Sequence, residues 1–152
     1  MRLDAEARGI TPAFPAELEK SAPEIVREQR TLWQTRRQER ENSLETLARQ
    51  LTQRQQELAE ARARHQALGD AIGPAREALA IEEKLAANGA GARADLLTAQ
   101  QRYTSQKGEL ETTRIAIGRI QASVAEAQAR LSETRARFLT ETSKEKSEAE
   151  LR

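Results

Sequence analysis

The stretch KLAANGAGARADLL, residues 84–97, decides how the two halves of this chain relate to each other. Gly89 and Gly91 stand close together between two long, charged, alanine-rich segments. Asn88 and Gly89 can end a helix with a left-handed residue, and Asp95 suits the first turn of a following helix because the helix dipole favours an acid there. The stretch is either a flexible joint or the turn of a helical hairpin.

The composition favours long helices over a compact globular core. Among 152 residues, 32% are charged and only 3% are aromatic, and the commonest residues are good helix formers. The formal net charge of +1 gives no electrostatic reason to expect nucleic acid as a partner. No apolar run is long enough to span a membrane, and MRLDAEARGI lacks the apolar segment of a signal peptide.

Catalysis receives little support from the residues present. The chain has no cysteine and one histidine, His65, so no thiol nucleophile, catalytic dyad or cysteine metal site can be assembled. We therefore expect a protein that is not an enzyme, with no catalytic, cofactor-binding or metal-ligating residues.

Apolar residues recur every seven positions in both halves, which is the pattern of a coiled coil. In the first half, positions a and d are Leu44, Leu47, Leu51, Arg54, Leu58, Ala61, His65, Leu68, Ile72, Ala75 and Leu79. In the second half they are Leu96, Ala99, Tyr103, Gln106, Leu110, Thr113, Ile117, Ile120, Val124, Ala127, Leu131, Thr134 and Phe138. Folding the chain at Gly91 brings the two a series together, with His65 beside Ile117. The mirrored patterns predict an all-α fold, a long antiparallel coiled-coil hairpin, and not a flexible joint.

The predicted organisation has four parts. Residues 1–20 form a short helical stub, which Gly9 can end, and a connector interrupted by Pro12 and Pro15. Residues 21–88 form the first long helix, with Ser21 as its cap. Residues 89–92 form the hairpin tip. Residues 93–152 form the returning helix, which we expect to fray after about residue 140 because the apolar pattern ends there.

Two stretches of the first helix depart from the ideal pattern. Gly69, Gly73 and Pro74 predict a kink at 69–74, since proline inside a helix removes a backbone hydrogen bond. The kink is either a tolerated bend or a hinge that aims the tip. Upstream, the same heptad frame places arginines on core positions between residues 30 and 40, so this end is either splayed or faces another element such as the N-terminal stub.

Three stretches resemble a known family. These stretches are similar to the periplasmic α-helical hairpin of haemolysin D-like adaptors, the membrane fusion proteins of type I secretion. They are LDAEARGITPAFPAEL (3–18), PEIVREQRTLWQTRR (23–37), and the tip with the returning helix, from Glu82 to Leu131. Together these stretches cover nearly the whole chain.

The resemblance implies a role in protein export. Such adaptors are anchored in the inner membrane beside an ABC transporter, and several copies form a periplasmic tube. Their hairpin tips meet a TolC-like outer-membrane channel. The chain would then be the periplasmic part of an inner-membrane-anchored protein, with the channel, the transporter and neighbouring copies of itself as partners.

The resemblance also implies which residues touch the channel. Adaptors of this kind often carry an Arg, a Leu and a Ser at the tip; here Leu85 matches, whereas Ile81 stands at the Arg position and Ala92 at the Ser position. The expected docking residues are Leu85, Asn88, Gly89, Gly91, Ala92, Arg93, Asp95 and Leu96. The alternative from the residues alone is a cytoplasmic coiled-coil dimerisation or scaffold module with parallel helices.

Overall fold

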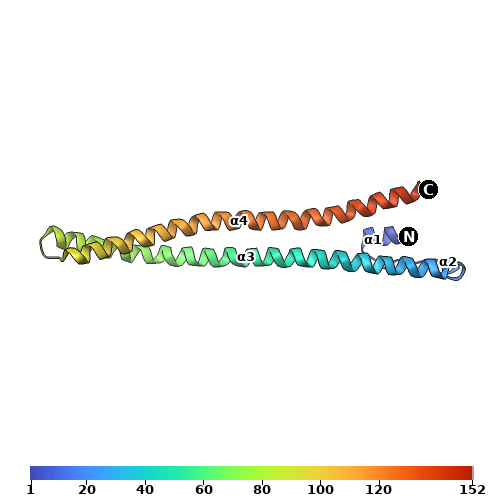
Figure 1. Cartoon of the computed structure of the whole chain (residues 1–152), viewed down its shortest axis with the longest axis horizontal. Helices are drawn as coiled ribbons and strands as arrows, with labels where there is room; N and C mark the ends of the chain where they lie inside the picture. The colour runs from blue at the N-terminus through green and yellow to red at the C-terminus, as the bar shows by residue number, and fades with distance from the viewer. Residues whose placement is uncertain (152) are drawn as a thin grey trace. The chain divides into compact units, whose positions relative to one another are not determined.

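The computed structural model describes residues 1–151, and every regular element in that range is helical. In chain order these are α1 (Arg2–Arg8), α2 (Ala16–Ser21), α3 (Pro23–Ala87) and α4 (Arg93–Glu150). Helices α3 and α4 make the two arms of a helical hairpin, as the mirrored heptads predict (Figure 1).

The chain divides into two compact units, which we describe separately. The terminal unit contains Met1–Leu51 and Glu126–Arg152, and the turn unit contains Thr52–Ala125. The terminal unit therefore holds α1, α2, the start of α3 and the end of α4. The turn unit holds the remainder of the two arms and the turn that joins them.

Burial within the arms follows the heptads. From Leu44 to Leu79 on α3 and from Leu96 to Phe138 on α4, all residues at positions a and d are buried or half-buried except Arg54. The buried side chains in these ranges are Ala75 and Leu131, each 5% exposed. A pair of helices shields only one stripe of each partner, so a half-buried seam is what this architecture provides.

One contact fixes the pairing of the arms within the turn unit. Nδ1 of His65 lies 3.0 Å from Oγ1 of Thr113, so an a position faces a d position. The expected pairing of His65 with Ile117 is therefore incorrect. Because the arms are antiparallel, an a residue of one arm pairs with a d residue of the other. The residue midway between His65 and Thr113 is Gly89, so the arms pair symmetrically about Gly89 instead of Gly91.

The start of α3 also differs from the expectation. Ser21 is the last residue of α2 and does not cap α3. The carbonyl of Ala22 accepts the first helical bond, from the N–H of Val26 at 3.2 Å, and Pro23 occupies the first helical position. The missing N–H of proline costs nothing at that position.

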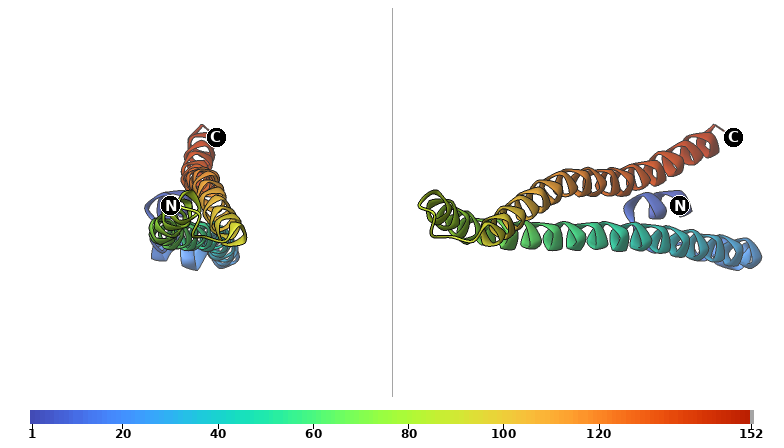
Figure 2. Two further views of the ribbon diagram at one scale, coloured as in Figure 1. Left: turned by 90° about the vertical axis from the view of Figure 1, so that its left-hand side faces the viewer. Right: turned by 60° about the vertical axis from the view of Figure 1, so that its left-hand side comes forward.

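Helix α3 is continuous through Pro74. Figure 2 shows its axis changing direction in the turn unit, between the green middle of the helix and its olive end. The end of α4 also differs from the expectation, because it remains helical to Glu150 instead of fraying after about residue 140. Contacts from Glu145 and Lys146 to other helices of the terminal unit hold this last part.

Candidate functional site

The turn between the arms is built by backbone hydrogen bonds that end α3. Gly89 has φ +69, a left-handed conformation in which a side chain would be strained. Its N–H donates to the carbonyl of Ala86 at 3.1 Å, and the N–H of Ala90 donates to the carbonyl of Leu85 at 2.9 Å. This pair of bonds is the Schellman motif, which confirms that Gly89 ends the first long helix.

Leu85 is the centre of this turn. Its carbonyl also accepts a hydrogen bond from the N–H of Gly91 at 3.2 Å. A Cβ added to Gly91 would lie 3.0 Å from the Cβ of Leu85 and 3.2 Å from the backbone nitrogen of Ala86. Gly91 is thus required for close approach and Gly89 for its backbone angle, so the two glycines have separate physical roles.

The expected docking residues gather on this turn and on the helix ends beside it. Leu85 is 39% exposed. Arg93 and Asp95 are exposed, and their side chains make no hydrogen bond or ion pair within residues 1–151. Leu96 and Gly91 are half-buried. Asn88, Gly89 and Ala92 are exposed.

Two further exposed apolar residues lie near the turn in the sequence and were not among the expected docking residues. Ile81 is 58% exposed and Leu97 is 54% exposed. Both lie off the a and d positions, and large apolar residues at such positions were the signal in the sequence that could have identified them. We call Ile81, Leu85 and Leu97 the tip apolar residues.

The helix α4 begins without a side-chain cap. The carbonyl of Ala92 accepts hydrogen bonds from the N–H groups of Asp95 at 3.1 Å and Leu96 at 3.3 Å, so Ala92 stands at the N-cap position. An alanine methyl cannot accept a hydrogen bond from the free N–H groups of the first turn. Those N–H groups and the dipole favour an acid, and Asp95 lies in this turn.

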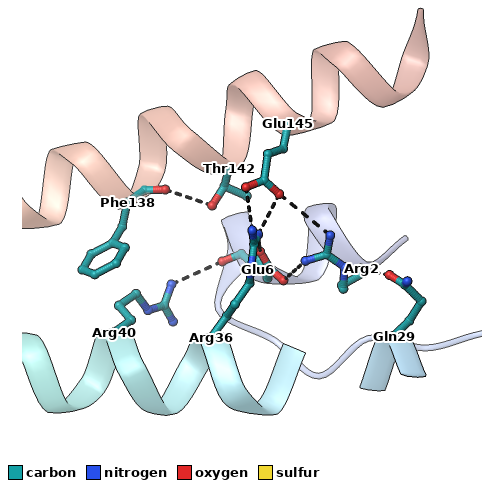
Figure 3. Close-up of polar contacts among 8 residues, drawn as sticks. All are labelled: Arg2, Glu6, Gln29, Arg36, Arg40, Phe138, Thr142 and Glu145. Atoms are coloured by element: carbon teal, nitrogen blue, oxygen red, sulfur yellow. Dashed lines mark hydrogen bonds and ion pairs between the residues drawn. The ribbon is translucent and has the colours of Figure 1, made fainter. Parts of the chain in front are cut away.

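The terminal unit contains a second cluster of polar residues, in which α1 bridges α3 and α4 (Figure 3). Both guanidinium nitrogens Nη1 and Nη2 of Arg36 donate to Glu145, at 2.7 Å each. Arg36 also lies 3.4 Å from Glu6, and Arg2 binds Glu6, Gln29 and Glu145. We call Arg2, Glu6, Arg36 and Glu145 the α1 clamp.

The clamp explains the arginine-rich part of the first helix. Arg40 donates to the carbonyl of Glu6 at 3.4 Å, whereas Arg37 stacks over Trp33 at 5.3 Å. Val26 and Trp33, in the same part of α3, are buried, at 3% and 8% exposure. Of the two alternatives from the sequence, contact with the N-terminal stub is therefore the one that the structure shows.

The clamp changes the ionisation of its members. Hydrogen bonding to Arg36 holds the pKa of Glu145 below its usual value, and the same contact raises the pKa of Arg36. Beside the clamp, the hydrogen bond from Lys146 lowers the pKa of Asp4 and raises that of Lys146. A cavity of about 200 Å³ adjoins this cluster, with Trp33 and Phe138 among its lining residues.

Within residues 1–151, no three histidine, cysteine or acidic side chains come together in a way that could hold a metal ion. In the same range, no helix is both long enough and apolar enough to cross a membrane.

Comparison with known proteins gives one structural match and one family. The fold is similar to the crystal structure of the soluble domain of LipC, a membrane fusion protein of a type I secretion system, with a TM-score of 0.85 and 22% identity. The match covers 99% of this chain and 73% of the LipC chain. Comparison with curated protein sequences gives no significant match. The family model described as AprE, long alpha-helical hairpin, matches residues 1–152, and the chain therefore belongs to the AprE long α-helical hairpin family.

Proposed function

We propose that this chain is the periplasmic hairpin of a membrane fusion protein in a type I secretion system. The turn contacts a TolC-like outer-membrane channel, while other parts of the full-length protein contact an inner-membrane ABC transporter. Family membership and the fold shared with the soluble domain of LipC support the class of protein.

The observation that carries the channel contact is the character of the turn. Backbone hydrogen bonds hold Leu85 at the turn, and Ile81 and Leu97 are exposed on the arms near it. Arg93 and Asp95 are also exposed, and their side chains have no partner among the described residues. Exposed apolar residues beside unpaired charges are typical of a protein–protein contact. Backbone hydrogen bonds already fix the conformation of the turn, so little conformational entropy is lost when it binds a partner.

The parallel dimer module is not supported. The seam of α3 in the turn unit is covered by α4 of the same chain, as the His65–Thr113 contact and the half-buried heptad residues indicate. A second copy would have to displace α4 to pack there.

The test replaces Leu85 by glutamate in the full-length protein and measures export of the substrate from cells. We expect loss of export, because a charge replaces an apolar contact, while the helical content and Tm of the chain stay unchanged. Ile115→Glu is the matched control, since Ile115 is 64% exposed and lies in the same unit away from the turn. Normal export by Leu85→Glu, or equal loss with Ile115→Glu, would contradict docking through the tip.

A further inference from the structure

Residues that weaken a helix gather at one level of both arms in the turn unit. In α3 these are Gly69, Gly73 and Pro74. The His65–Thr113 contact gives the pairing of the arms, and counting equally toward the turn from both residues leads to Asp70 and Gly108. Gly108 of α4 therefore lies opposite the weak stretch of α3.

Packing does not require the glycines at this level. A Cβ built on Gly69, Gly73 or Gly108 meets no heavy atom within 4 Å, so alanine would fit at each position. Alanine is also the better helix former. Gly91 differs from these three glycines, because a Cβ there would lie 3.0 Å from the Cβ of Leu85.

The backbone and the seam are both weak at this level. Pro74 has no N–H to donate to the carbonyl of Asp70, so the helix lacks one bond there. On α4, Oε1 of Gln106 is buried and has no hydrogen-bond partner. The same count from His65 and Thr113 places Gln106 opposite Ile72. The isoleucine side chain has no hydrogen-bond donor for Oε1 of Gln106.

We propose that residues 69–74 of α3 and 104–109 of α4 form one hinge shared by both arms. The hinge lets the segment that carries the turn pivot within the turn unit without losing its helices. The bend of α3 in this unit is one position of that pivot (Figure 2). The role of the pivot, which rests on the proposed function, is to aim the tip apolar residues at the channel.

The motion can be measured on the 152-residue chain, which has no cysteine of its own. Spin labels at Ala67 and Ile81 bracket the hinge, and labels at Gln53 and Ala67 span the same number of residues outside it; all three sites are exposed. Each pair is separated by roughly 21 Å in a straight helix. We expect a clearly broader distance distribution for the Ala67–Ile81 pair, and equal widths would overturn the hinge.

A second variant pair tests whether the two arms act together. Gly108→Ala should narrow the Ala67–Ile81 distribution on α3, although the substitution is on α4. Gly118→Ala is the matched control, because a Cβ there also meets nothing within 4 Å but lies away from this level. Equal effects of the two substitutions would overturn the shared hinge.

Export assays separate the hinge from the proposed function. A Gly69→Ala, Gly73→Ala and Gly108→Ala combination that narrows the distribution should reduce export if aiming matters, whereas Gly118→Ala should not. If Leu85→Glu blocks export but the stiffened variant exports normally, tip docking stands and the aiming role fails. If Leu85→Glu exports normally, the proposed function fails, whatever the distance measurements show.

Discussion

The carboxylate of Glu145 accepts two hydrogen bonds from the guanidinium of Arg36, although the residues are 109 positions apart in the chain. The bidentate pair joins the start of α3 to the end of α4 inside the terminal unit. Through Glu6 and Arg2 the same pair fastens α1 (Figure 3). The α1 clamp therefore joins α1, α3 and α4 through polar contacts in the terminal unit.

Breaking the Arg36–Glu145 pair should loosen the terminal unit. Both side chains are 37% exposed, so water weakens the attraction, and we expect Arg36→Ala or Glu145→Ala to cost about 1 kcal/mol of unfolding free energy. A double-mutant cycle in urea measures the coupling. The double variant should cost less than the two single changes together. Additive losses would show that the pair has no coupling.

Acid should loosen the clamp before it melts the arms. The pKa of Glu145 is lowered in the folded chain, chiefly by its hydrogen bond to Arg36, so its stabilisation is present above the ordinary value of 4.5. This stabilisation is lost as the pH falls through the lowered folded pKa. Trp33, 8% exposed beside the clamp, is the one tryptophan and reports the change by fluorescence.

The fluorescence of Trp33 should be constant from about pH 7 to pH 5 and should shift to the red below about pH 4. Glu145→Gln should reduce the acid-dependent part of the shift, since glutamine does not titrate. An identical acid transition in Glu145→Gln would assign the effect to another carboxylate, such as Asp4, whose pKa Lys146 also lowers.

Replacing Gly89 by alanine should destabilise the turn. Alanine at φ +69 costs about 1 kcal/mol or more, because its Cβ approaches the following carbonyl. Thermal unfolding followed by circular dichroism would show a lower Tm. Gly118→Ala should raise the Tm slightly, since that glycine is inside a helix with open space beside it. A Gly89→Ala chain as stable as the original would contradict the left-handed turn.

Replacing Ala92 by serine should stabilise α4. Serine at the N-cap position accepts a hydrogen bond from a free N–H of the first turn, which is worth about 1 kcal/mol. The neighbouring Ala90→Ser is the control, because Ala90 precedes the cap and belongs to the α3 terminus. We expect a higher midpoint in urea for Ala92→Ser only. Equal midpoints would place the start of α4 elsewhere.

The two arms could be predicted from the sequence because apolar residues at heptad spacing fall on one face of a helix, and this is the face that the structure buries. The a and d residues from Leu44 to Leu79 are buried or half-buried except Arg54, and the Asn88–Gly89 pair allows a left-handed end. The exact pairing was harder to predict. The sequence offers mirrored heptads, but only the His65–Thr113 contact shows that a faces d.

The α1 clamp could not be read from a periodic pattern. Its members come from three helices, and nothing in the sequence of any one helix distinguishes them from its other charged residues. The contact of α1 with the arginine-rich segment was one of two expectations, but the partner Glu145 lies where the apolar pattern has already ended. Ion pairs between distant segments depend on the tertiary arrangement, which the sequence pattern does not show. The helical structure of α4 up to Glu150 was not predicted, because ion pairs of this kind hold its last part.

The most direct test of the central claim is site-specific photo-crosslinking in cells that contain the full-length protein and its outer-membrane channel. A photoreactive amino acid at Asn88 or Arg93 should capture the channel, because both side chains are exposed at the turn. The same probe at Ala63 or Arg119, exposed on the arms of the turn unit, should not. Capture from Ala63 and Arg119 with none from Asn88 and Arg93 would contradict the account.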